Sequence, residues 1–222
     1  MFITFEGMDG SGKTTQLSLI TAYLREQGYD VLLTREPGGT HFGDEIRSLL
    51  LDKNEIEHEQ MHPRTELLLF CASRAQLVAE VILPHLEKGG LVISDRFFDS
   101  TYAYQGYGHG LNLKDLKRTV MFATGGLKPD LTIFLDISPK DGLQRRAQAS
   151  LFGEEWNRLD AMAIEFHDRV YEGYQALIKE TPRRWLTMDA MRDIETIQSD
   201  IQTELSKRLK RKKSLKKKVV KS

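Results

Sequence analysis

Residues 1–15, MFITFEGMDGSGKTT, decide the fold of this chain. Residues 1–6 have the apolar pattern of a short buried strand, and residues 7–14 fit the pattern G-x-x-x-x-G-K-[ST] at every fixed position. The glycines allow backbone angles that a side chain would penalise, so consecutive N–H groups can surround phosphate oxygens. The residues predicted to bind nucleotide phosphates are Gly7, Met8, Asp9, Gly10, Ser11, Gly12, Lys13 and Thr14.

Two side chains at the end of this loop add to the prediction. Lys13 can reach the outer phosphates, and Thr14 offers a hydroxyl to Mg²⁺. The helix that begins there directs its positive end toward the same anion. An ordinary strand-turn-helix connection is the alternative, but the strand before the loop and the helical pattern after it favour a nucleotide site.

Composition places the chain among soluble globular proteins. The 222 residues are 40% hydrophobic and 29% charged, and no apolar run approaches the roughly 18 residues that span a membrane. No basic region precedes the first strand, which argues against a cleavable signal. The single cysteine, Cys71, excludes an internal disulfide and suits a reduced cytosol. We therefore expect a cytoplasmic protein with no membrane segment.

Charge divides the chain into an acidic body and a basic end. Residues 207–222 hold ten of the 32 basic residues and no acidic one, so residues 1–206 carry 22 basic and 32 acidic residues. We expect one folded domain over 1–206 and a solvated, disordered tail over 207–222. Contact between the tail and a nucleic acid or an acidic membrane is the less favoured alternative, and the tail lacks the aromatics of sequence-specific recognition.

The remaining chain alternates strands and helices. Strands are expected over 30–34, 91–94, 130–137 and 185–189, and helices over 64–88, 112–124, 161–178 and 193–206. Because a helix links the first two strands, the sheet should be parallel with right-handed crossovers. The pattern predicts an α/β fold with one doubly wound sheet of about five parallel strands and helices on both faces.

Several polar residues fall where such a sheet places ligands. Asp95 and Arg96 follow the third strand, where a carboxylate can lie beside a metal, although a strand-end ion pair is the alternative. Arg74 interrupts an apolar helix and needs either a buried carboxylate or a ligand. Residues 97–110 suit either a polar-aromatic pocket or a surface loop. His58 and His62 are interpreted as part of a solvated connection rather than a metal site.

Together, five stretches resemble one family, the thymidylate kinases. They are GMDGSGKTT at 7–15, REPGGT at 35–40 with GDEIR after it, LLLFCASR at 67–74, SDRFFDSTYAYQG at 94–106 and NRLD at 157–160. The resemblance covers residues 1 to about 190. It implies a P-loop NTPase-type fold and transfer of the γ-phosphoryl group of ATP to dTMP, giving dTDP and ADP in dTTP biosynthesis. It also implies a requirement for Mg²⁺ and a homodimer.

The resemblance assigns roles to individual residues. It implies that Arg47 and Arg96 hold the dTMP phosphate, and that Asp9 and Tyr104 lie near the sugar. Thymine would stack on Phe70 and bond to Arg74, Thr101 and Gln105, while Glu36 and Pro37 would shape the pocket. Thr14 and Asp95 would serve Mg²⁺. Phe70 and Arg74 are four apart, hence on one helix face, which favours a ligand as the partner of Arg74.

The expected lid is a short segment over about 145–159, and it departs from the family pattern. It looks longer than the lid that is usual in the family, and it contains Glu154, Glu155 and Trp156. Arg145, Arg146 and Arg158 are candidates to reach the phosphates; we favour Arg146 or Arg158, and the alternative is that they pair with nearby carboxylates. The predicted catalytic set is Asp9, Lys13, Asp95, Arg96, Arg146 and Arg158.

Three other functions compete with the kinase interpretation, and each can be distinguished from it. A P-loop switch protein that reads guanine would carry an N-K-x-D motif, which the sequence lacks. A nucleic-acid-binding protein would depend on the basic tail. A kinase for another nucleoside monophosphate is the nearest rival, and it differs in its preferred base.

Overall fold

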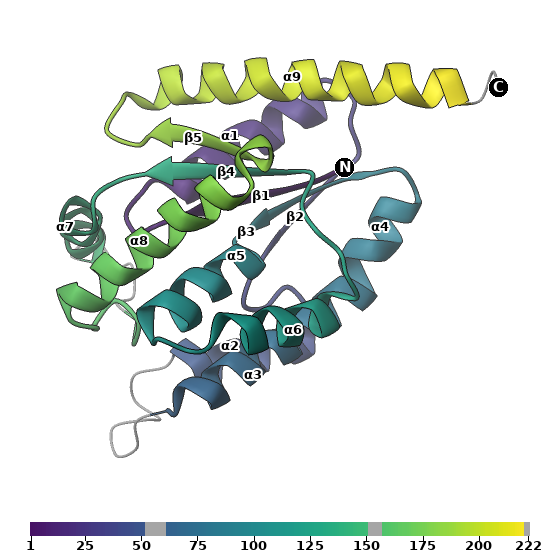
Figure 1. Ribbon diagram of the computed structural model, residues 1–222. Helices are drawn as coiled ribbons and strands as arrows, with labels where there is room; N and C mark the ends of the chain where they lie inside the picture. The colour runs from purple at the N-terminus through teal and green to yellow at the C-terminus, as the bar shows by residue number, and fades with distance from the viewer. Residues whose placement is uncertain (52–60, 151–156, 220–222) are drawn as a thin grey trace.

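A five-stranded parallel sheet forms the centre of the molecule (Figure 1). The computed structural model describes residues 1–51, 61–150 and 157–219. The strands are β1 (Phe2–Gly7), β2 (Val31–Arg35), β3 (Leu91–Asp95), β4 (Leu131–Asp136) and β5 (Trp185–Asp189). They pair in the order β2-β3-β1-β4-β5, and every pair is parallel. The predicted α/β fold with a doubly wound sheet is therefore confirmed.

The strands are connected by α-helical, π-helical and 3-10 helical segments. The α-helices are α1 (Lys13–Glu26), α2 (His41–Leu51), α3 (Pro63–Leu77), α4 (Leu83–Glu87), α5 (Phe98–Thr101), α6 (Leu113–Thr124), α7 (Pro139–Ser150), α8 (Ile164–Glu180) and α9 (Ile194–Val219). Two π-helical segments, η2 (Val78–Ile82) and η3 (Tyr102–Gly108), and the short 3-10 helix η4 (Pro182–Arg184) complete the described elements.

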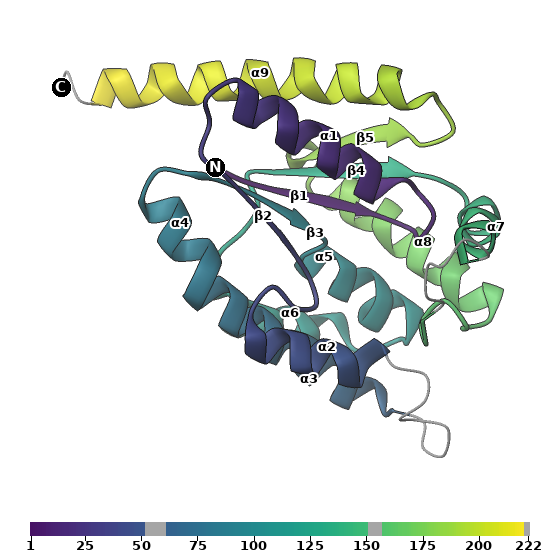
Figure 2. The ribbon, with the colours of Figure 1, turned by 180° about the vertical axis from the view of Figure 1, so that it is seen from behind.

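Helices cover the sheet on both faces. In Figure 1, α8 and α5 lie in front of the strands, and in Figure 2, seen from behind, α1 lies in front of them with α9 beside it. The central strand β1 is buried along its whole length. Because β1 and β3 are parallel neighbours, the loop after β1 and residues 95–96 emerge at the same edge of the sheet.

One long helical stretch runs from α3 through η2 to α4. His62 caps its start by accepting a hydrogen bond from the Arg64 N–H. Pro84 cannot donate to the carbonyl four residues earlier, which explains why the π-helical turn stands just before it. By length and composition, Pro63–Glu87 could cross a membrane, and 39% of its most apolar window is buried. Leu77, Val78 and Ile82 pack in the core, as in a core helix.

The structure decides between the alternatives for one segment and extends another beyond its expected end. Residues 97–110, which suited a pocket lining or a surface loop, form α5 and η3, and several of their side chains line the cavity described below. Helix α9 continues to Val219, beyond the expected domain end at residue 206 and into the segment expected to be a disordered tail. The apolar residues recur every four positions up to Leu209, which is buried, and this repeat carries the helix onward.

Candidate active site

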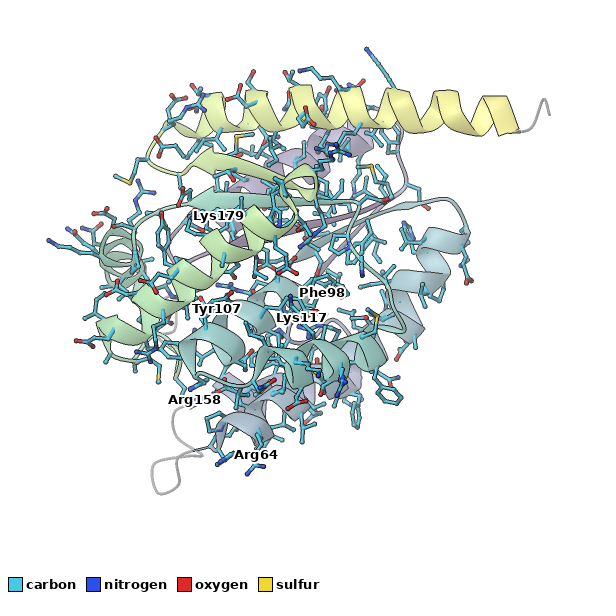
Figure 3. All side chains as sticks on the ribbon, viewed as in Figure 1. Arg64, Phe98, Tyr107, Lys117, Arg158 and Lys179 are labelled. Atoms are coloured by element: carbon cyan, nitrogen blue, oxygen red, sulfur yellow. The ribbon has the colours of Figure 1, made fainter. Side chains whose placement is uncertain are left out.

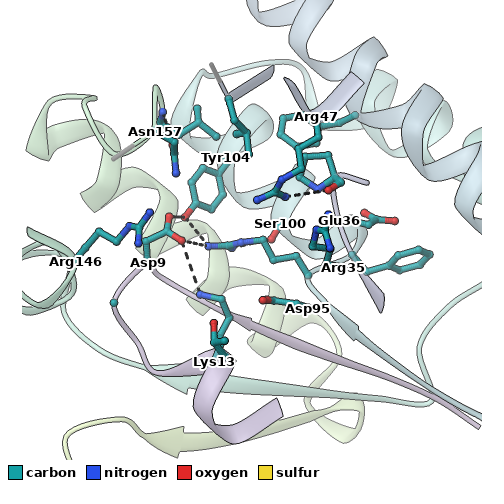
Figure 4. Close-up of a pocket in the computed structure, with 18 of the residues that line it drawn as sticks. Asp9, Lys13, Arg35, Glu36, Arg47, Asp95, Ser100, Tyr104, Arg146 and Asn157 are labelled. Carbon is teal, nitrogen blue, oxygen red and sulfur yellow. Dashed lines mark hydrogen bonds and ion pairs between the residues drawn. The ribbon is translucent and has the colours of Figure 1, made fainter. Parts of the chain in front are cut away.

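A cavity of about 410 Å³ opens at the carboxyl ends of β1, β2 and β3 (Figure 4). It is large enough for a small ligand. Of the predicted site residues, it is lined by Asp9, Gly10, Gly12, Lys13, Thr14, Glu36, Pro37, Arg47, Phe70, Arg74, Asp95, Arg96, Thr101, Tyr104, Gln105 and Arg146. Arg35, Ser100, Arg145 and Asn157 are among the further lining residues. Gly7, Met8, Ser11 and Arg158 are absent from the lining of the cavity as the structure describes it.

The glycine-rich loop after β1 adopts the backbone geometry that its glycines allow. Gly10 has a φ of 76°, and a Cβ added there would lie 2.1 Å from the Gly142 carbonyl oxygen, so only glycine fits. Lys13 Nζ donates hydrogen bonds to the carbonyls of Gly7 (3.2 Å) and Met8 (2.9 Å). Burial lowers the pKa of Lys13. The lysine is thus held against the loop, where phosphate oxygens would replace carbonyls as acceptors.

Arg96 and Asp9 form the charged centre of the cavity (Figure 4). Arg96 Nη2 donates to Asp9 Oδ1 at 2.7 Å, and the Tyr104 hydroxyl donates to Asp9 Oδ2 at 3.2 Å. Burial alone would raise the pKa of Asp9, but the cations of Arg96 and Lys13 hold that pKa well below its ordinary value. Arg96 has a φ of 66°, a conformation that costs a non-glycine residue energy and is often found at functional sites.

A buried carboxylate, Glu6, is linked to Arg96 through the hydroxyl groups of Ser100 and Tyr174. Glu6 accepts hydrogen bonds from the Ser100 hydroxyl (2.6 Å) and the Tyr174 hydroxyl (2.9 Å), and Arg96 Nη1 donates to both of these oxygens (3.0 and 3.3 Å). Burial raises the pKa of Glu6 to about 7, with a further rise from Asp99. The sequence analysis missed this group, although an acidic residue within a buried strand is an available signal.

Arg74 has the buried carboxylate partner that one of its two sequence interpretations required. Arg74 Nε donates to Glu36 Oε2 at 2.8 Å and Nη2 donates to the Thr101 hydroxyl at 3.0 Å, and the arginine is 1% exposed. Its Nη1 is buried with no hydrogen-bond partner among the described residues. Arg74 therefore has an internal carboxylate as partner, and it also lines the cavity, as Phe70 does.

Arg47 and Asp95 line the cavity together with Arg96. Arg47 Nη1 donates to the Pro37 carbonyl at 3.0 Å, which holds the guanidinium at the cavity wall. Asp95 Oδ1 is buried and accepts no hydrogen bond from the described residues, and Thr14 lines the same cavity. Mg²⁺ is usually bound by one or two carboxylates together with substrate phosphates, so these two residues fit it.

Gln105 is held by a carboxylate that the sequence analysis also missed. Its Nε2 donates to Glu66 Oε1 at 2.6 Å, and both side chains are buried. Glu66 lies on α3 four residues before Phe70 and eight before Arg74, so the three share one helix face. That spacing was an available signal in the sequence.

The three lid arginines take different partners. Arg146 lines the cavity and its Nε lies 3.3 Å from Asp160 Oδ2. Arg145 also lines the cavity, and its Nη1 donates to the Ala190 carbonyl at 3.0 Å. Arg158 instead donates to the Leu50 carbonyl and pairs with Glu66 (Figure 3). Glu154, Glu155 and Trp156 of the expected lid, and His58, lie outside the described residues.

Comparison with known proteins places the whole arrangement in one family. The thymidylate kinase family profile matches residues 5–201. The chain is 52% identical over 210 residues to a thymidylate kinase from Roseiflexus castenholzii, which covers 90% of each chain. It is 50% identical over 211 residues to one from Herpetosiphon aurantiacus, covering 86% of this chain and 88% of that one.

A solved structure agrees with these sequence matches. The crystal structure of thymidylate kinase from Ehrlichia chaffeensis superposes with a TM-score of 0.74 at 34% sequence identity, covering 93% of this chain and 98% of that chain. Fold, cavity and sequence thus point to the same conclusion: the chain belongs to the thymidylate kinase family and is an enzyme that uses ATP to phosphorylate dTMP to dTDP.

Proposed function

We propose that the cavity holds ATP and dTMP together, with the ATP phosphates on residues 7–14 and the dTMP base beside Phe70. The observation that carries this proposal is that one cavity joins Lys13 and the Asp9–Arg96 pair to Phe70 and Arg74. Arg47 and Arg96 hold the dTMP phosphate, because two guanidinium groups can bind a phosphate through several charged hydrogen bonds. Asp9 and Tyr104 lie near the sugar.

The residues of this site act by position and charge. The acceptor phosphate is already an anion, so no side chain has to remove a proton from it. Arg96 and Arg47 align its oxygen with the γ-phosphoryl group, and Lys13 with Arg146 offsets the charge of the donor phosphates. Asp95 and Thr14 would hold Mg²⁺, which neutralises phosphate charge during transfer.

We also infer that two copies of this chain associate through α3 and α6. These helices pack on each other, and they expose Leu68 on α3 and Met121 and Phe122 on α6, with Phe122 90% exposed. A surface of this kind is typical of a protein interface. A second copy suits it because an identical pair of helices is a matching apolar surface. The resemblance noted in the sequence also implies a homodimer, and the single cysteine suits a cytoplasmic location.

The test is ADP release from ATP and Mg²⁺ with dTMP, dUMP, dCMP, dGMP or AMP as acceptor. We expect dTMP to give the highest kcat/KM, and Lys13→Ala to lower kcat by about a hundredfold or more, because it removes a charge at the transferring phosphoryl group. The matched control is Lys114→Ala, an exposed lysine on α6. Preference for a purine monophosphate would contradict the assignment of the base site.

A further inference from the structure

The carboxylate of Glu66 contacts Gln105, which lines the part of the cavity that we propose binds the base. Glu66 itself does not line the cavity. Glu66 is 0% exposed. Its Oε1 accepts from Gln105 Nε2 at 2.6 Å and lies 3.1 Å from His109 Nε2, while Oε2 accepts from Arg158 Nη2. Burial alone would raise the pKa of Glu66, but the contacts with His109 and Arg158 hold that pKa below its ordinary value. Glu66 is therefore a buried carboxylate that only accepts hydrogen bonds.

This acceptor decides which way the Gln105 amide points. A side-chain amide carries two donors on one end and an acceptor on the other. Because a carboxylate has no hydrogen to give, the amide nitrogen must face Glu66, and Oε1 is the end left for a ligand. Gln105 lines the cavity. The wall therefore presents a hydrogen-bond acceptor at this position.

The guanidinium of Arg74 belongs to the same cavity. Arg74 Nη1 has no partner among the described residues, and Arg74 lines the cavity with Gln105. A donor and an acceptor together complement a ring edge in which a carbonyl adjoins an N–H. Thymine and uracil have that edge. Cytosine reverses it, with an amino group beside a ring nitrogen that lacks a hydrogen.

We propose that Glu66 is a positioning residue that fixes the Gln105 amide with its oxygen toward the base and so sets the preference for a thymine over a cytosine edge. The proposal rests on the placement of the dTMP base beside Phe70 given above. Glu66 does not touch the substrate and acts only through Gln105. The ion pair with Arg158 maintains the charge of the carboxylate on which this orientation depends.

The primary test is Glu66→Gln, which keeps the shape but lets the side chain donate as well as accept. The Gln105 amide is then free to turn, and we expect the ratio of kcat/KM for dTMP to that for dCMP to fall about tenfold, as for a lost buried hydrogen bond. The dTMP to dUMP ratio should not change, because these bases share the same edge. His109→Asn, which removes a different partner of Glu66, should leave the dTMP to dCMP ratio within about twofold.

A second variant separates this inference from the proposed function. Gln105→Leu should lower the dTMP to dCMP ratio, and Glu66→Gln should then change it no further, because two residues that act as one unit are not additive. If Gln105→Leu leaves the ratio unchanged, the base placement is wrong. If Gln105→Leu lowers it and Glu66→Gln does not, the inference about Glu66 is wrong and the base placement stands.

A double variant that exchanges the side chains of Glu66 and Gln105 tests whether the effect of Glu66→Gln comes from a general disturbance of α3. In the double variant Glu66→Gln with Gln105→Glu, the carboxylate at position 105 again accepts a hydrogen from the base. We expect the thymine preference to return toward that of the original enzyme, with melting curves recorded for every variant. A ratio that stays at the level of Glu66→Gln would overturn the proposal.

Discussion

Two arginines in the cavity are each held by a partner of opposite charge. Glu36 holds Arg74 and Asp9 holds Arg96, and each arginine keeps part of its guanidinium at the cavity wall. A partner that fixes an arginine beforehand reduces the entropy lost when substrate binds. The geometry of the site therefore depends on ion pairs that are already formed before substrate binds.

We predict that Arg74→Lys lowers kcat/KM for dTMP by about tenfold or more. Lysine keeps the charge but loses the planar fork that joins Glu36 and Thr101 and that we propose also binds the base. Steady-state kinetics with dTMP as the varied substrate measure the effect. Arg64→Lys, an exposed change on the same helix, is the control and should match the original enzyme. Equal losses in both variants would contradict a role for Arg74 in substrate binding.

Glu6 predicts a pH dependence of stability. Its pKa is about 7 in the folded protein, above the ordinary value of 4.5, so the folded state holds this proton more tightly than the unfolded state. The stability that this contributes is present at low pH and is lost as the pH rises through about 7. Between pH 5 and pH 8, we expect Glu6 to lower the free energy of unfolding by about 2 kcal/mol.

Urea unfolding of the original protein and of Glu6→Gln at both pH values measures this difference. The free energy of unfolding of the original protein should fall more steeply from pH 5 to pH 8 than that of the variant, which lacks the titrating group. Parallel profiles would show that Glu6 does not titrate in this range.

Elements of regular pattern could be predicted from the sequence. Strand β1 and the loop after it follow from residues 1–15, and the helix expected over 112–124 is α6, where Asn112 accepts hydrogen bonds from the N–H groups of Lys114 and Asp115. The pairing of Glu6 with Ser100 and Tyr174 could not be predicted, because no local pattern tells which distant side chains meet. The partner of Arg158 was missed for the same reason.

Helix α9 carries a prediction of its own. Ile197, Ile201, Leu205 and Leu209 are all buried, so the packed face extends past residue 206. We expect Leu209→Ala to lower the free energy of unfolding by about 2 to 3 kcal/mol, as for other buried leucines. Lys210→Ala, at an exposed neighbour, should stay within about 0.5 kcal/mol. Chemical denaturation measures both, and equal effects would mean that residue 209 does not pack.

The whole molecule is proposed to work as a pair of chains, and Phe122 tests that proposal. A lysine at this position would place a charge in the apolar interface, so we expect Phe122→Lys to shift sedimentation from a dimer to a single 25.5 kDa chain. Lys114→Ala on the same helix should remain dimeric. An original protein that sediments as a single chain would contradict the proposed interface.

The buried pair of Arg74 and Glu36 also restricts the mutational paths open to this gene. Removal of either partner leaves the other charge buried without compensation, which costs about 3 to 5 kcal/mol. That is a large share of the stability of a typical domain. A lineage could therefore replace the pair only by changing both codons together or by first acquiring stabilising substitutions elsewhere, which makes these two positions evolve as one.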